Sequence, residues 1–149
     1  MTATGRFVSG VAISETLLAM GPAPIKVLLA DDDEGFVRSL RELIDSQPEL
    51  SVVAAARNGI EAIELADENS VHAAVIDLHM PLLDGVTTIT RLRRDHPALC
   101  LIVLTGDSDT TLHAAALEAG ADAVLEKNEL AGRLIERLGR LAWNGESRT

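Results

Sequence analysis

Residues 73–85 read AAVIDLHMPLLDG, an apolar run that ends on an acid and then meets a proline and a glycine. Val75 and Ile76 have the character of a buried strand, because apolar runs without polar alternation are typical of strands covered on both faces. Asp77 follows them directly, although an acid is among the least suitable side chains to bury. An acid in this place predicts a binding site at the carboxyl end of a parallel strand.

The alternation of strand-like runs and helical patterns extends along the chain from Ile25. Strands are expected at residues 25–30, 51–56, 73–77, 99–105 and 122–126. Five helices are expected between and after these strands. The first has an apolar stripe of Phe36, Leu40, Leu43 and Ile44, and the second lies at about 59–68. The third carries Val86, Ile89 and Leu92 and ends at Pro97, the fourth lies at about 109–118 before Gly120, and the last starts at Glu129 and carries Leu130, Leu134, Leu138 and Leu141. Such an alternation predicts an α/β fold, a flavodoxin-like, doubly wound parallel sheet in the strand order 2-1-3-4-5 with helices on both faces.

Polar residues stand at the carboxyl ends of four of the predicted strands, at the same edge of the sheet. They are Asp31, Asp32, Asp77, Thr105 and Lys127. Three carboxylates about 5 Å apart repel one another by roughly 3 kcal/mol per pair at an effective dielectric constant near 20, so the cluster predicts a bound cation. Oxygen ligands of this kind suit Mg²⁺, and with a hydroxyl and an ammonium group they form a site for phosphoryl transfer.

Each of these residues taken alone has a plainer interpretation. Asp31, Asp32 and Asp33 precede a helix, where an acid is commonly a cap, and a lysine after a strand is commonly a solvated charge. The joint placement at four strand ends favours the site over the separate interpretations.

Four stretches resemble the response regulator receiver domain of two-component signalling. They are VLLADDDEGF, AVIDLHMPLLDG, LIVLTGD and GADAVLEK, in the order and spacing of that family, and the resemblance covers about residues 25–142. The resemblance implies that Asp77 accepts a phosphoryl group, that Asp32 binds Mg²⁺ directly and Asp31 through water, and that the main-chain carbonyl of His79 completes the protein ligands.

The same resemblance implies that Thr105 and Lys127 contact the phosphoryl group. The chain is then expected to be no enzyme in its own right, but a phospho-acceptor that catalyses only its own phosphorylation and dephosphorylation. Its expected partners are a sensor histidine kinase or histidine phosphotransfer protein and a downstream protein target. A homodimer through the face formed by the helix near 109–118, the strand 122–126 and the last helix is a further expectation.

Two positions depart from the family pattern. Val124 stands three residues before Lys127, where the family usually has Tyr or Phe, and Asn128 stands where it usually has proline. Because Val124 lacks a ring, we expect weaker coupling between Thr105 and the face described above. Pro81 and Gly85 are expected to shape the loop after Asp77.

The rest of the chain is interpreted from its composition. The formal charge of −10 argues against binding nucleic acid through this domain and against an anionic membrane surface. Residues 1–24 are predicted to be a loosely ordered extension, with a short helix over SETLLAM as the alternative, and residues 143–149 to be a tail. With one cysteine and only a faint likeness to a signal peptide, the chain is expected to be cytoplasmic.

Three alternative functions stay open on the sequence. The chain is expected to be a lone receiver, but it could also be the receiver fragment of a longer DNA-binding response regulator. A receiver that is never phosphorylated is disfavoured because all five site residues are present. A phosphatase of the haloacid dehalogenase type is disfavoured because no further acidic metal motif follows Lys127 in the required order.

Overall fold

The computed structural model describes residues 23–106 and 110–144. The strands are β1 (Ile25–Ala30), β2 (Leu50–Ala56), β3 (Ala73–Asp77), β4 (Cys100–Thr105) and β5 (Ala123–Glu126). The helices are α2 (Glu34–Asp45), α3 (Gly59–Asn69), α4 (Gly85–Asp95), α5 (Thr110–Ala119) and α6 (Leu130–Asn144), with a short 3₁₀ helix η1 (Lys127–Glu129) before the last. The alternative of a helix over SETLLAM lies outside the described residues.

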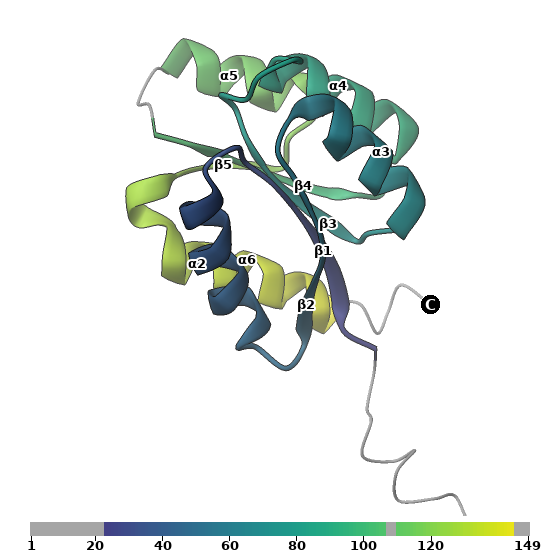
Figure 1. The fold of residues 1–149 in the computed structure, drawn as a ribbon, viewed down its shortest axis with the longest axis vertical. Coiled ribbons are helices and arrows are strands. Elements are labelled where there is room, and N and C mark those ends of the chain that lie inside the picture. Colours follow the sequence, from purple (N-terminus) through teal and green to yellow (C-terminus); the bar gives the residue numbers. More distant parts are fainter. Residues whose placement is uncertain (1–22, 107–109, 145–149) are drawn as a thin grey trace, which may run out of the picture.

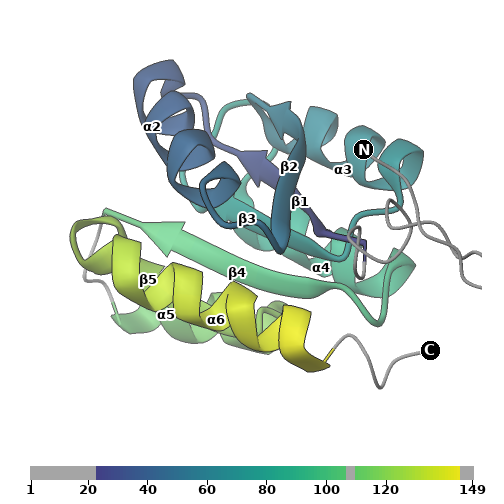
Figure 2. The same ribbon diagram turned by 90° about the horizontal axis from the view of Figure 1, so that it is seen from below.

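The five strands form one parallel sheet in the order β2-β1-β3-β4-β5. The predicted fold class and strand order are thereby confirmed. Helices α2 and α6 cover one face of the sheet, and α3, α4 and α5 cover the other (Figures 1 and 2). Because the chain winds in both directions from β1 and β3, the carboxyl ends of these two strands lie side by side at the point where the winding reverses.

The core has two halves, one on each face of the sheet. All five residues of β3 are buried, because this strand lies in the middle of the sheet with helices on both sides. Leu40 and Ile44 of α2 pack with Leu134 and Leu138 of α6 on one face. Alanine, leucine, isoleucine and valine side chains make up most of the core, as the scarcity of aromatic residues predicts.

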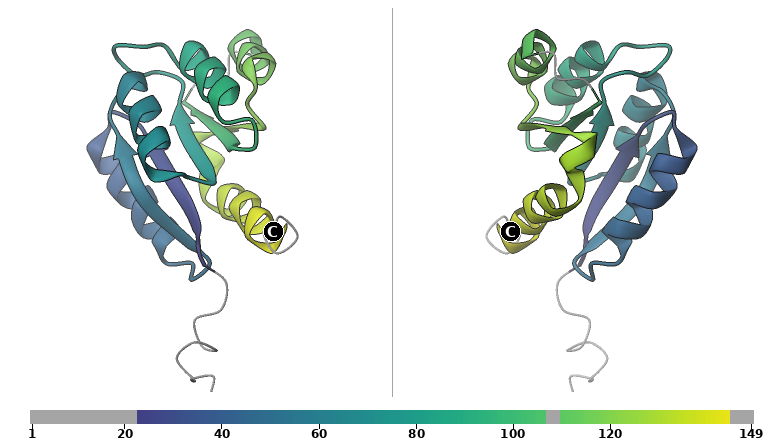
Figure 3. Two further views of the ribbon diagram at one scale, coloured as in Figure 1. Left: turned by 90° about the vertical axis from the view of Figure 1, so that its right-hand side faces the viewer. Right: turned by 90° about the vertical axis from the view of Figure 1, so that its left-hand side faces the viewer.

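The connections at the opposite end of the sheet are held by Arg93 of α4. Its guanidinium group donates to the carbonyls of Gly120, Pro97 and Leu99 at 2.7–3.0 Å and pairs with Asp122 at 2.9 Å. Gly120 follows α5 with a positive φ of 122°, in agreement with its predicted role as a helix end. The two side views in Figure 3 show α5 (green) above β5 and α6 (yellow) below it. No helix among the described residues combines the length and hydropathy that crossing a membrane would need.

Candidate functional site

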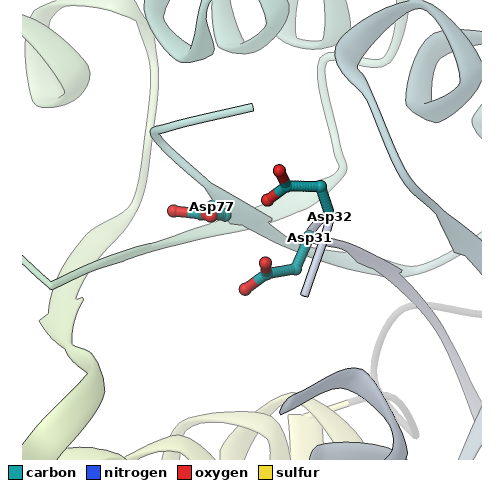
Figure 4. Close-up of side chains that lie close together, drawn as sticks. All are labelled: Asp31, Asp32 and Asp77. Atoms are coloured by element: carbon teal, nitrogen blue, oxygen red, sulfur yellow. The ribbon is translucent and has the colours of Figure 1, made fainter. Parts of the chain in front are cut away.

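Three aspartates meet where β1 and β3 end. Ala30 lies in register with Ile76, so the residues that follow them, Asp31 and Asp77, lie at the same level at the carboxyl ends of β1 and β3. One carboxylate oxygen from each of Asp31, Asp32 and Asp77 lies within 4.8 Å of the others. Figure 4 shows the three side chains extending in the same general direction from the strand ends. The sequence-predicted acid cluster is therefore present in the structure.

Asp31 is nearly fully buried, with 4% of its surface exposed. Its Oδ1 accepts a hydrogen bond of 2.9 Å from the main-chain N–H of Asp33. Lys127 Nζ lies 2.7 Å from its Oδ2. This approach is an ion pair, because none of the described residues offers that oxygen a donor in hydrogen-bonding geometry.

Asp33 caps the helix that follows, α2, and so has a different role from Asp31 and Asp32. Its Oδ1 accepts a hydrogen bond of 3.1 Å from the N–H of Phe36, in the first turn of α2. Asp32, the middle acid, is exposed at the mouth of the site. One of the three consecutive acids is thus structural, and the other two face the cluster with Asp77.

Asp77 is as buried as Asp31, and its two oxygens have different neighbours. Oδ1 accepts a hydrogen bond of 3.1 Å from the N–H of His79, and Oδ2 lies 3.5 Å from Lys127 Nζ. Burial raises the pKa of Asp77 above its usual value, and the Asp31 charge adds to this effect. The His79 N–H and the Lys127 charge act against it without cancelling it. The ionised form of Asp77 is therefore destabilised, and a cation beside it would relieve that cost.

Lys127 begins η1 directly after β5 and directs its ammonium group into the acid cluster. Burial lowers its pKa, but the close contact with the Asp31 carboxylate and the charges of Asp77 and Asp31 outweigh burial and raise the pKa above its ordinary value. Lys127 therefore stays protonated. A single ammonium group leaves the three carboxylates with two uncompensated negative charges.

Thr105 is the last residue of β4 and has no exposed surface. Asp77 pairs with Leu104 in the register of β3 and β4, so Thr105 lies one residue farther toward the mouth of the sheet. Thr105 pairs with Glu126 in the register of β4 and β5, and Glu126 is the residue before Lys127. The structure thus brings Thr105, Asp77 and Lys127 to one edge, as the sequence predicts.

The donor set fits a small divalent cation. Among the described residues, Asp31, Asp32 and Asp77 are the one group of three acidic, histidine or cysteine side chains placed to share an ion. All three offer oxygen, which Mg²⁺ prefers, and the exposure of Asp32 leaves room for the waters that this ion usually keeps. The Asp31 oxygen without an aligned donor is a natural partner for such an ion or its water. The role of the His79 carbonyl stays a prediction.

The loop after Asp77 is held by close packing where α4 begins. A Cβ atom on Gly85 would lie 2.6 Å from the carbonyl oxygen of Leu78, so only glycine fits. Asp84 caps α4 by accepting hydrogen bonds from the N–H and hydroxyl of Thr87 at 2.9 and 2.8 Å. Leu82 adopts a positive φ of 74° at the exposed tip of the loop. Gly85 thus has the structural role that the sequence predicts.

Phe36 is a neighbour of the site that the sequence pattern did not single out. The centre of its ring lies 4.4 Å from Lys127 Nζ. The helical period places Phe36 on the apolar stripe of α2, but the stripe alone gives no sign of a contact with Lys127.

The comparisons with known proteins agree with this geometry. The family model described as "Response regulator receiver domain" matches residues 27–139. The chain is 37% identical over 105 residues to a protein-glutamate methylesterase/protein-glutamine glutaminase 4 of Myxococcus xanthus, and these cover 70% of the chain and 30% of that relative. It is 33% identical over 115 residues to the nitrate/nitrite response regulator protein NarP of Escherichia coli, which cover 77% of the chain and 54% of NarP.

A solved structure gives the same result. The response regulator domain of Thermotoga maritima CheB superposes with a TM-score of 0.72 at 28% identity, over 80% of this chain and 96% of that one. The chain spans between about a third and about half of the length of the two relatives above. The likeness therefore concerns one part of each relative, and their names describe longer proteins.

Proposed function

The chain belongs to the response regulator receiver domains of two-component systems, and from that premise we propose that it accepts one phosphoryl group on Asp77 and thereby changes how it binds a protein partner. The observation that carries the proposal is the buried Asp77 carboxylate, which lies within 4.8 Å of Asp31 and Asp32 and 3.5 Å from the Lys127 ammonium group. Asp77 is the nucleophile, since its Oδ1 accepts the His79 N–H while its Oδ2 faces the Lys127 ammonium group.

The proposed step transfers a phosphoryl group from a histidine nitrogen of the donor to a carboxylate oxygen of Asp77. A carboxylate oxygen of Asp77 attacks the phosphorus of a phosphohistidine, and the phosphorus–nitrogen bond breaks as the new oxygen–phosphorus bond forms. The electron pair of the broken bond stays on the imidazole nitrogen, so the donor leaves as neutral histidine once that nitrogen is protonated. Hydrolysis by water later returns the carboxylate and releases inorganic phosphate.

The chain's own groups supply electrostatic stabilisation to this transfer. Lys127 neutralises charge on the phosphoryl oxygens, because it is protonated and already lies beside Asp77. The Thr105 hydroxyl at the end of β4 donates a hydrogen bond to one of those oxygens. Bound Mg²⁺, held by Asp31, Asp32 and Asp77, would supply further neutralisation of the same charge.

The partners follow from the proposed chemistry. The phosphodonor is a sensor histidine kinase or a histidine phosphotransfer protein, and a downstream protein reads the phosphorylated state in the cytoplasm. The exposed surface of α5, β5 and α6 is a candidate for that partner or for a second copy of the chain. The family membership leaves the haloacid dehalogenase alternative without support.

A second candidate is the receiver part of a longer regulator with an output domain. This candidate is favoured because the chain matches only part of each relative, namely 54% of NarP and 30% of the methylesterase. The length of the natural gene product, measured on the protein isolated from its own cells, decides between the two candidates.

Reaction with phosphoramidate tests the proposal because this small donor also has a phosphorus–nitrogen bond. The parent protein should gain one phosphoryl group with Mg²⁺ present, and hydroxylamine should release it, as expected of an acyl phosphate. Lys127→Met should react more slowly. A label that resists hydroxylamine would contradict the proposal, since it would be an ester on a hydroxyl side chain.

A further inference from the structure

Helix α2 does not require an aromatic residue at the position of Phe36. Phe36 lies in the first turn of α2 and is partly buried against the core between α2 and α6. A leucine would also place an apolar side chain against that core, but only an aromatic ring presents a face with negative potential to a cation.

The contact with Lys127 closes a ring of interactions around Asp31. Asp31 Oδ1 accepts the Asp33 N–H at 2.9 Å, and Asp33 Oδ1 accepts the Phe36 N–H at 3.1 Å. The Phe36 ring lies 4.4 Å from Lys127 Nζ, which in turn lies 2.7 Å from Asp31 Oδ2. The cap that starts the helix therefore also fixes the place of the ring, and the ring and Asp31 both contact the ammonium group.

Lys127 needs such support because its side chain is long and flexible. Four methylene groups separate its charge from the main chain, and 26% of the side chain is exposed. Asp31 and Asp77 both attract the ammonium group, which lies 2.7 Å from an oxygen of the first and 3.5 Å from an oxygen of the second. An aromatic ring attracts the ammonium group without taking up its N–H donors or adding negative charge.

We propose that Phe36 is a positioning residue that holds the Lys127 ammonium group between Asp31 and Asp77, where it meets the phosphoryl group on Asp77. Phe36 touches no reacting atom and acts only through Lys127. This inference rests on the proposed function for its effect on phosphorylation, whereas the contact itself exists in the unphosphorylated protein.

The rate of Asp77 phosphorylation by acetyl phosphate tests the effect on the reaction. Phe36→Leu should lower the rate constant about three- to fivefold, the effect expected for losing a partly exposed cation–π contact. Phe36→Tyr keeps a ring and should retain the parent rate. In a Lys127→Met background, Phe36→Leu should have no further effect, since the two substitutions then remove the same interaction.

An equal loss from Phe36→Leu in the parent and in the Lys127→Met background would overturn the proposal, because packing alone would explain it. A loss in Phe36→Tyr as large as in Phe36→Leu would also overturn it. Melting temperatures identify a variant that fails to fold, and Phe36→Met then takes the place of the leucine variant.

A second measurement is independent of phosphorylation. Carbon-13 relaxation at Lys127 Cε in the unphosphorylated protein reports how tightly the end of the side chain is held on the picosecond to nanosecond timescale. The order parameter should fall in Phe36→Leu and stay at the parent value in Phe36→Tyr. An unchanged value in Phe36→Leu would refute the positioning role even if the phosphorylation proposal holds. If the parent is never phosphorylated, the proposed function fails and this measurement still decides the role of Phe36.

Discussion

Magnesium should stabilise the fold, and one acid should account for most of the effect. Asp32→Asn removes an exposed carboxylate that has no role in the helix cap. We expect the melting temperature of the parent protein to rise with Mg²⁺ and that of Asp32→Asn to rise far less. Asp32→Asn should also melt no lower than the parent without metal, because the substitution removes one negative charge from the cluster.

The spacing of the acids explains why a cation should stabilise the fold, and the ratio of the Mg²⁺ concentration to its Kd sets the size of the effect. Two ionised carboxylates such as Asp31 and Asp77, with one oxygen of each within 4.8 Å of the other, repel by about 3.5 kcal/mol at an effective dielectric constant of 20. Lys127 offsets part of this repulsion, and solvent screens the exposed Asp32. Mg²⁺ at ninefold excess over its Kd adds about 1.4 kcal/mol to the free energy of unfolding. For a domain of this size the corresponding rise in melting temperature is about 5 °C.

Asp33→Asn is the matched control for this experiment. It removes the same charge from the neighbouring residue, and asparagine replaces aspartate well as a helix cap. Its response to Mg²⁺ should equal that of the parent in thermal melts monitored by circular dichroism. The assignment of Asp32 as a ligand would be refuted if Mg²⁺ left the melting temperature of the parent unchanged. It would also be refuted if Asp32→Asn and Asp33→Asn reduced the Mg²⁺-dependent rise in melting temperature equally.

Three further outcomes are expected. Burial raises the pKa of Asp77, so ionisation of this carboxyl group opposes folding at neutral pH. Asp77→Asn should therefore raise the free energy of unfolding of the metal-free protein at neutral pH. In urea titrations, this gain in stability should shrink as the pH falls through the raised pKa toward 3.8. Gly85→Ala should cost about 1–3 kcal/mol in the same titrations, because its Cβ would collide with the main chain of Leu78, whereas Gly132→Ala in α6 meets no atom within 4 Å and should be neutral or stabilising. Because Val124 has no ring, beryllofluoride should change amide chemical shifts on the face of α5, β5 and α6 less than at the carboxyl end of β4; equally large changes on both would contradict this expectation.

The fold was predictable from the sequence because the strands are short apolar runs and helices such as α2 and α6 have a clear apolar stripe. The run Ala73–Asp77 shows why: it is buried along its whole length, so its lack of polar alternation carried a clear signal. Once five strands alternate with helices, right-handed connections leave few orders for the sheet. The acid cluster followed from the same reasoning, since parallel strands end at one edge.

The contacts within the site were less predictable. Three consecutive acids begin α2, and each has the chemistry of a cap; only the backbone geometry assigns that role to Asp33 and leaves Asp31 and Asp32 for the cluster. The sequence also gave no sign that Lys127 pairs more closely with Asp31 than with Asp77, because a flexible side chain chooses its partner by distance in the fold. The contact between Lys127 and Phe36 was missed for the same reason.

The mass of the intact protein after treatment with acetyl phosphate and Mg²⁺ tests the central claim most directly. The account predicts that the parent gains one phosphoryl group, that Asp33→Asn gains it equally, and that Asp77→Asn gains none. Asp77→Asn keeps the shape of the side chain but lacks the nucleophilic carboxylate. Undiminished labelling of Asp77→Asn, or no labelling of the folded parent, would contradict the account.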